Sequence, residues 1–194
     1  MNNTFSSFAD YGRLASILIS LKNSDVASDI EELANSLVGA IKAGKRLIVF
    51  GNGGSAAEAS HFAAELVSKC STDHNPWPAI SLSDSNPIIT AIGNDYGFDK
   101  IFSRQLEAHL QEGDLVVGLS TSGKSPNVLN ALNYSVGKGN STYLLTGSRL
   151  ETAPIAGLKL VRAPIADTPR IQELHLIWIH FLSEFCEREI LQVE

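Results

Sequence analysis

Five short apolar runs alternate along this chain with stretches of helical periodicity, and this alternation restricts the fold more than any other feature. The runs are Lys45–Phe50, Ala79–Leu82, Leu115–Leu119, Thr142–Leu145 and Leu158–Val161. Helical stretches at about 55–70, 99–111 and 126–138 separate most of them, and a further long helix is expected at about 168–191. Because parallel strands need a returning helix between them, the alternation predicts a three-layer α/β sandwich of the flavodoxin-like type, with a five-stranded parallel sheet.

The residues before the first strand are expected to add an N-terminal pair of helices to this core. Apolar residues recur there at helical spacing, as Leu14, Ile17, Leu18 and Leu21 and then as Ile30, Leu33, Leu37 and Ile41. At 194 residues, the chain is long enough for one domain with a core of normal size. We therefore expect a single domain over residues 1–194, with helices in 1–43 and the α/β core in 44–194.

Charge and cysteine content exclude several classes of function. The 21 acidic and 15 basic residues give a net charge of −6 without a basic run, which argues against a nucleic-acid or membrane partner. Cys70 and Cys186 are too few for a disulfide framework, which favours a reducing cytoplasm. Because the N-terminal sequence lacks a basic start followed by an apolar stretch, and no apolar run approaches about 18 residues, we expect neither a secretion signal nor a membrane span.

The turn after the first expected strand is rich in glycine. Its sequence, Gly51-Asn52-Gly53-Gly54-Ser55-Ala56, fits the dinucleotide pattern G-x-G-x-x-A, although a tight turn with nothing bound has the same composition. Ser55 is expected to cap the next helix, on which His61 and Glu65 share one face. Such a pair can bind one metal ion, place an acid beside a base, or simply face solvent.

Four hydroxyl side chains, those of Ser120, Thr121, Ser122 and Ser125, crowd the loop after the third expected strand. Gly118–Ser125 also satisfies the P-loop pattern G-x-x-x-x-G-K-[ST]. We reject a P-loop because Pro126 suits the first helical position with Ser125 as N-cap, and because no later strand ends in an aspartate suited to magnesium. Since a helix N-terminus attracts anions, the loop predicts a site for a phosphorylated small molecule.

The last expected helix, which opens with Asp167 or Thr168 as its cap, is apolar nearly all round. This is typical of a helix in the core or in a subunit interface. Gln172 and His180 lie about 80° apart around its axis and about 12 Å apart along it. The pattern gives His175 no feature that separates it from an ordinary surface or boundary histidine.

Five motifs, in this order, resemble those of the bacterial phosphoheptose isomerases of the SIS (sugar isomerase) superfamily. They are Gly51–Ser55, His61–Leu66, Gly93–Phe98, Ser120–Ser125 and Arg170–His175. The resemblance covers nearly the whole chain, including the N-terminal helices. It implies a single SIS domain that converts sedoheptulose 7-phosphate to D-glycero-D-manno-heptose 7-phosphate through an enediol, as the first step toward the nucleotide-activated heptose of lipopolysaccharide or related glycans.

The resemblance also implies roles for individual residues, with Glu65 and His180 as the acid–base pair. The phosphate and adjacent substrate would be held by Ser55, Ser120, Thr121, Ser122 and Ser125. The sugar would be bound by Asn52, Gly53, Gly54, Glu65, Asn94, Asp95 and Gln172. One zinc ion per subunit would be bound by His61, Glu65, Gln172 and His180. The two roles of Glu65 compete, because a carboxylate fully engaged by zinc is a poorer base.

The family's tetrameric habit implies a homotetramer with residues 1–43 in its packing. Because zinc lies only about 2.0–2.2 Å from its ligands, one chain can hardly supply both Gln172 and His180, so we expect a neighbouring subunit to donate one of them. Two other functions remain open. One is a non-catalytic SIS regulator that binds a phosphosugar, such as a partner of the replication initiator, which would require loss of catalytic residues that this chain retains. The other is a nucleotide-binding enzyme.

Overall fold

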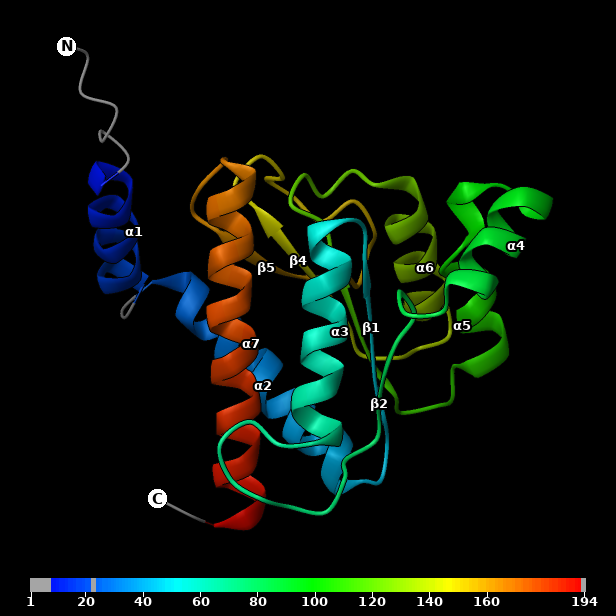
Figure 1. Cartoon of the computed structure of the whole chain (residues 1–194), viewed down its shortest axis with the longest axis horizontal. Coiled ribbons are helices and arrows are strands. Elements are labelled where there is room, and N and C mark those ends of the chain that lie inside the picture. Colours follow the sequence, from blue (N-terminus) through cyan, green and yellow to red (C-terminus); the bar gives the residue numbers. More distant parts are fainter. Residues whose placement is uncertain (1–7, 22–23, 193–194) are drawn as a thin grey trace.

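A parallel sheet of five strands runs through the middle of the structure, a computed structural model that describes residues 8–21 and 24–192 (Figure 1). The strands are β1 (Leu47–Gly51), β2 (Ala79–Ser81), β3 (Leu115–Leu119), β4 (Thr142–Gly147) and β5 (Lys159–Ala163). They lie in the order β2-β1-β3-β4-β5, and every neighbouring pair is parallel. This is the flavodoxin-like order, so the predicted fold class is confirmed.

Helices cover both faces of the sheet (Figure 1). One face carries α2 (Asp25–Lys42), α3 (Gly54–Val67) and α7 (Thr168–Leu191), with α1 (Phe8–Leu21) beside α2. The other carries α4 (Asn86–Tyr96), the short 3-10 helix η1 (Phe98–Lys100), α5 (Ser103–His109) and α6 (Pro126–Gly137). Within β1, Leu47 and Val49 pack toward the first group of helices, whereas Ile48 and Phe50 pack toward the second. This period-two alternation places β1 in the centre of a core with two halves.

Two local predictions were wrong. The helix expected at 99–111 is shorter, because the chain turns through η1 and α5 begins only at Ser103, while α4 precedes it as a helix that the periodicity did not reveal. Between them Gly97 has a φ of +96°, a conformation that favours glycine and ends α4. Ser55 does not cap α3, which begins at Gly54 with Gly53 as its N-cap.

The predicted starts of the helices α6 and α7 are confirmed. Ser125 is the N-cap of α6, and Asp167 is the N-cap of α7, each with proline in the first turn. Residues 1–7 and 22–23 of the expected N-terminal helical pair lie outside the described residues. Among the described helices, none has the combination of length and apolar sequence needed to cross a membrane.

Candidate active site

The two glycine-containing loops lie next to each other at the carboxyl ends of the adjacent strands β1 and β3. In a sheet of this order, the connections change direction between these strands and leave a crevice where ligands bind. Two hydrogen bonds join the loops, since Asn52 Nδ2 donates to Asn127 Oδ1 (2.9 Å) and Asn127 Nδ2 donates to Asn52 Oδ1 (2.8 Å). The sequence reasoning missed the buried Asn127, although its place just after Pro126, at the start of α6, is a signal that could have revealed it.

The first loop is packed too tightly for larger residues. Gly53 has a φ of +56°, and a Cβ on Gly51 would lie 2.7 Å from the backbone oxygen of Ser55. Glycine is therefore required at Gly51 by close approach and favoured at Gly53 by conformation. The result is that Ser55 is buried in the first turn of α3, at the positive end of the helix dipole.

The second loop brings hydroxyl groups together at the start of α6. The Oγ atoms of Ser120 and Ser125 lie 3.1 Å apart, and the Oγ of Ser122 accepts a hydrogen bond from the backbone N–H of Lys124 (3.2 Å). Thr121 is half-buried, whereas Ser122 is exposed. Hydroxyl and N–H donors at a helix N-terminus suit a phosphate group.

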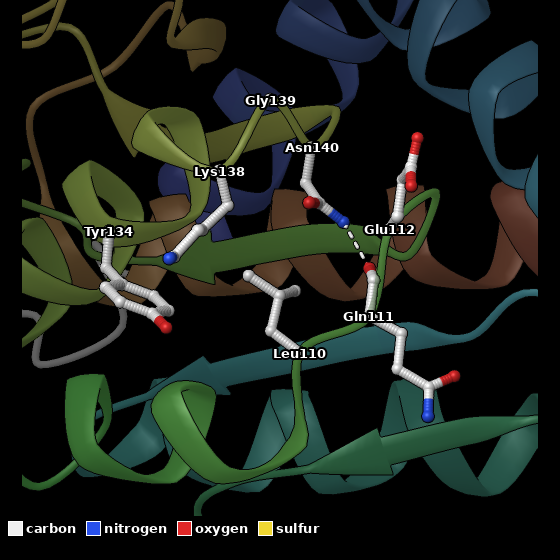
Figure 2. Close-up of a pocket in the computed structure, with 7 residues that line it drawn as sticks. All are labelled: Leu110, Gln111, Glu112, Tyr134, Lys138, Gly139 and Asn140. Atoms are coloured by element: carbon white, nitrogen blue, oxygen red, sulfur yellow. Dashed lines mark hydrogen bonds between the residues drawn. The ribbon is translucent and has the colours of Figure 1, made fainter.

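A cavity of about 420 Å³ lies at the opposite end of the sheet, before β3 and β4 begin (Figure 2). Its walls are Leu110, Gln111, Glu112, Tyr134, Lys138, Gly139 and Asn140. The side-chain amide of Asn140 is already hydrogen-bonded within the protein, because its Nδ2 donates to the carbonyl oxygens of Gln111 (2.7 Å) and Asp114 (3.0 Å). None of the site residues predicted from the sequence lines this cavity.

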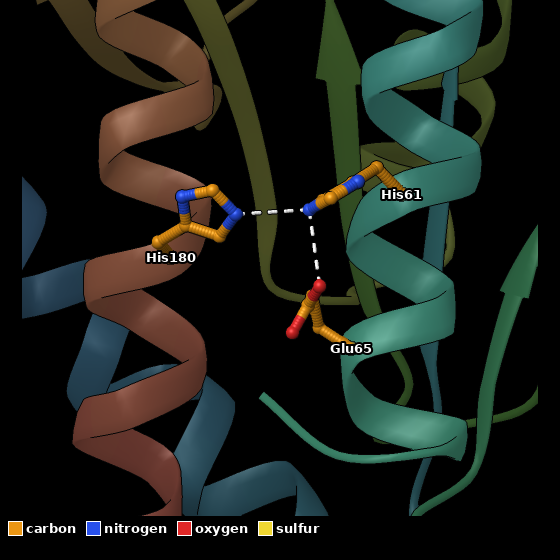
Figure 3. Close-up of side chains that lie close together, drawn as sticks. All are labelled: His61, Glu65 and His180. Atoms are coloured by element: carbon orange, nitrogen blue, oxygen red, sulfur yellow. Dashed lines mark hydrogen bonds and ion pairs between the residues drawn. The ribbon is translucent and has the colours of Figure 1, made fainter. Parts of the chain in front are cut away.

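Three side chains from α3 and α7 converge on one point (Figure 3). The Nε2 atoms of His61 and His180 lie 2.9 Å apart, and His61 Nε2 lies 3.0 Å from Glu65 Oε1. One nitrogen or oxygen atom from each residue lies within 4.8 Å of the others. The His61 side chain is 41% exposed and that of Glu65 is 16% exposed, so the cluster is open to small molecules.

The donor set of this cluster fits zinc. His61 Nε2 can carry at most one hydrogen, so it cannot donate both to Glu65 and to His180. Three atoms with lone pairs therefore face one another with few hydrogens among them, which favours a cation between them. Two imidazole nitrogens and one carboxylate oxygen form the His₂Glu set of catalytic zinc sites, which leave a fourth position open.

Cys70, in the loop after α3, lies beside this cluster and was not predicted as part of it. Burial, together with a hydrogen bond to the Glu65 carboxylate, raises the pKa of the Cys70 thiol to about 12. The thiol thus stays protonated at neutral pH and is a donor to Glu65.

The remaining predicted residues lie elsewhere in this chain. Gln172 lies against the first glycine loop, because a Cβ on Gly54 would overlap its amide nitrogen, and Gly54 is about 10 Å along α3 from His61. The structure thus separates Gln172 from His180, and it is His180 of the same chain that joins His61 and Glu65. Asn94 and Asp95 lie on exposed α4, on the other face of the sheet, where Asn94 Nδ2 donates to Asp95 Oδ1 (2.7 Å).

The chain is similar to known proteins in both sequence and structure. A family described as "SIS domain" matches residues 11–147. The phosphoheptose isomerase of Citrifermentans bemidjiense is 49% identical over 167 residues, which cover 86% of each chain. The solved phosphoheptose isomerase of Francisella tularensis is 29% identical, with a TM-score of 0.85 over 97% of this chain and 100% of that one. The solved phosphoheptose isomerase GmhA of Neisseria gonorrhoeae is 31% identical, with a TM-score of 0.82; the match covers 92% of this chain and 95% of that one.

Proposed function

This chain belongs to the phosphoheptose isomerases of the SIS family, and from this premise we propose that Glu65 and His180 carry out its isomerisation of sedoheptulose 7-phosphate. The observation that carries the proposal is the convergence of a carboxylate and two imidazoles on one partly exposed point between α3 and α7. A regulator without catalytic function has no need of such a cluster.

The reaction moves a carbonyl group from C2 to C1. We propose that the Glu65 carboxylate removes the proton from C1, which gives an enediol, and returns it to C2. His180 moves a proton between the two oxygens, a role that suits a side chain whose ordinary pKa lies near neutrality. The product of these transfers is the aldose D-glycero-D-manno-heptose 7-phosphate, and the enzyme is regenerated in its starting protonation state. We place this step at the start of nucleotide-activated heptose synthesis.

His61, Glu65 and His180 are the residues that would hold a zinc ion in each subunit. Zinc, when bound, would polarise the substrate carbonyl and stabilise negative charge on the neighbouring oxygen. The hydrogen bond from the Cys70 thiol to the Glu65 carboxylate helps to orient this side chain.

The phosphate of the substrate is assigned to the helix N-termini of α3 and α6. Ser55, Ser120, Thr121, Ser122 and Ser125 offer hydroxyl donors there, and Asn52, Gly53, Gly54, Asn94, Asp95 and Gln172 remain the residues proposed for the sugar. Because the protein is negatively charged as a whole, the anion is captured by these local donors and not by the net charge.

We also propose a homotetramer, a single SIS domain per chain, and sites completed by neighbouring subunits. On α7, Ile177 and Phe181 flank His180 and are 39% and 36% exposed, and they line an apolar groove with Leu18, Leu21 and Ile30. A second subunit that covers this groove would bury apolar surface beside the cluster. Gln172 is then the ligand that a neighbour donates. The two cysteines are free thiols, which suits the cytoplasm proposed for the enzyme.

The isomerase proposal is tested by incubating the purified protein with sedoheptulose 7-phosphate and following the aldose by NMR. We expect turnover by the wild type, loss of turnover with a chelator, and recovery on adding zinc. Glu65→Gln should lower kcat by roughly a hundred- to ten-thousandfold, whereas Glu107→Gln, on the exposed surface of α5, should not change it. No turnover by the wild type, or full activity in Glu65→Gln, would contradict the proposal.

Sharing of the site is tested by mixing two inactive variants. Hybrids of Glu65→Gln and Gln172→Ala subunits contain sites with both wild-type residues only if these residues come from different subunits. Recovery of activity in refolded mixtures supports a shared site. Mixtures that stay as inactive as the separate variants contradict it.

A further inference from the structure

A second pair of ionisable side chains connects α3 to α7, between the first glycine loop and the cluster of His61, Glu65 and His180. Glu58 on α3 is 8% exposed, and His175 on α7 is completely buried, which corrects the expectation of a surface or boundary histidine. Glu58 Oε2 lies 4.0 Å from His175 Nδ1, and His175 Nε2 lies 3.5 Å from the carbonyl oxygen of Thr146 at the end of β4. The pair thus lies between two helices and the sheet.

Most polar atoms of this pair have no well-formed hydrogen bond. The Nδ1 of His175 and the Oγ1 of Thr146 are buried without one, and the buried carboxyl group of Glu58 interacts with the side chain of Ser55 but has no well-formed hydrogen bond. Buried polar atoms are rarely left in this state, because each costs free energy unless a partner satisfies it. The proximity of Glu58 Oε2 and His175 Nδ1 means that a small movement would satisfy both, provided that one carries a hydrogen and the other does not.

The chemistry of the surroundings decides where that hydrogen is. The carbonyl oxygen of Thr146 can only accept, so the hydrogen of a neutral His175 ring belongs on Nε2, and Nδ1 is left as an acceptor. Burial lowers the pKa of His175 to about 4, which keeps the ring neutral. Burial also raises the pKa of Glu58 to about 7, although the interaction with the Ser55 side chain lowers it by a smaller amount. The carboxyl group of Glu58 can therefore supply the hydrogen.

The pair belongs to a series of contacts along the two helices, which lie side by side (Figure 1). From one end to the other, the contacts are Gly54 with Gln172, Glu58 with His175, His61 with His180, and the backbone N–H groups of residues 70–72 with Glu187. Residue numbers increase together, so α3 and α7 run in the same direction. Glu58 precedes His61 by three residues, which is about one turn. A shift of one helix along the other at Glu58 would therefore move His180 relative to His61 and Glu65.

We propose that Glu58 and His175 are positioning residues for the isomerase, joined by a hydrogen bond from the Glu58 carboxyl group to His175 Nδ1 that holds the two halves of the acid–base cluster opposite each other. The inference rests on the proposed function for its effect on catalysis. Neither residue touches the substrate in this role.

Two variants of Glu58 separate the donor from the rest of the side chain. Glu58→Gln keeps the size and places an amide N–H where the carboxyl O–H was, whereas Glu58→Leu removes the donor. The matched control is Ser183→Ala, which removes another buried polar atom without a partner from α7, but away from the pair. We expect Glu58→Leu to lower kcat by roughly ten- to a hundredfold with KM within about threefold of wild type, and Glu58→Gln and Ser183→Ala to keep kcat within about threefold.

The ring nitrogens of His175 provide a readout that needs no substrate and that can be measured on the wild type alone. In ¹⁵N NMR spectra of the wild type near pH 6, His175 should be neutral, with hydrogen on Nε2 and a hydrogen-bonded Nδ1. In Glu58→Leu, the Nδ1 shift should move to that of a nitrogen without a donor. Hydrogen on Nδ1 in the wild type would overturn the proposal.

The kinetic outcomes are equally decisive. A Glu58→Leu variant with a lower Tm but wild-type kcat would show a structural role only, and a Glu58→Gln variant as slow as Glu58→Leu would exclude the hydrogen-bond donor as the cause. Absence of turnover in the wild type would contradict the proposed function alone, because the His175 spectrum tests the pair independently.

Discussion

The Nε2 atoms of His61 and His180 lie 2.9 Å apart, although 119 positions separate the two residues in the chain. The contact joins the first helix after β1 to the last helix of the fold. Two unprotonated imidazole nitrogens repel each other at this distance, and two protonated ones repel more strongly. The arrangement is favourable when one hydrogen or one cation lies between them, and the nearby Glu65 carboxylate favours the cation.

The first prediction concerns zinc affinity. His180→Asn should weaken zinc binding on the order of a hundredfold, because it removes one of three converging ligands and leaves a weak pair on α3. Competition with a chromophoric chelator measures the affinity. His109→Asn, on the exposed end of α5, is the control and should bind zinc like the wild type. Equal affinities for the two variants would exclude His180 as a ligand.

The second prediction concerns the phosphate loop. Ser125→Ala removes a hydroxyl that lies 3.1 Å from that of Ser120 at the N-terminus of α6. Loss of one hydrogen bond to a charged group should raise KM for the sugar phosphate, and the inhibition constant of inorganic phosphate, by roughly ten- to a hundredfold, with a smaller change in kcat. Ser141→Ala, on the exposed loop before β4, should leave both constants unchanged. A fall in kcat alone would place Ser125 at the reacting carbons.

The third prediction distinguishes two glycines of the first loop. A Cβ on Gly51 would meet the backbone of Ser55, which cannot move without disrupting α3, so Gly51→Ala should reduce the free energy of unfolding by about 2 kcal/mol or more. A Cβ on Gly54 would meet only the end of the flexible Gln172 side chain. Gly54→Ala should therefore fold normally and show the kinetic defect of Gln172→Ala. Urea unfolding and steady-state kinetics test both, and similar stability losses in the two variants would contradict the distinction.

The sequence was sufficient for the sheet because its three central strands, β1, β3 and β4, are buried along their whole length and rich in apolar residues, and each is followed by glycine or hydroxyl residues. It was also sufficient for the relation between His61 and Glu65, which depends only on the spacing within one helix. α4 was missed because its apolar stripe is short: Ile89 and Ile92 pack against the core but are only half-buried, and no residue of the helix is fully buried.

Contacts between distant elements could not be read from spacing. The spacing of about 12 Å between Gln172 and His180 on one helix does not show which of them meets His61, because that depends on how α3 and α7 pack; in the structure His180 contacts His61 and Gln172 lies against Gly54. The burial of His175 and the pairing of Asn52 with Asn127 depend on the same kind of tertiary packing. When a helix is apolar nearly all round, its sequence does not show which face the rest of the protein covers, so the burial of a histidine on it cannot be predicted.

The last prediction concerns the pH dependence of stability, in which Glu58 and His175 have opposite effects. The pKa of Glu58 is raised from 4.5 to about 7, so between these values the folded state holds a proton that the unfolded state releases. Its contribution to the free energy of unfolding therefore falls as pH rises. The pKa of His175 is lowered from 6.5 to about 4, so the unfolded state holds the extra proton there, and its contribution rises with pH.

Glu58→Gln removes the pH-dependent contribution of Glu58 and keeps that of His175. Because one pKa unit corresponds to about 1.4 kcal/mol, the free energy of unfolding of this variant relative to wild type should rise by up to about 3 kcal/mol between pH 4.5 and 7. Urea unfolding at a fixed protein concentration measures the difference at each pH, and Ser183→Ala should run parallel to the wild type. Parallel curves for Glu58→Gln and wild type would mean that Glu58 loses its proton as readily in the folded protein as in water, and the carboxyl group would then have no hydrogen to donate to His175 at neutral pH.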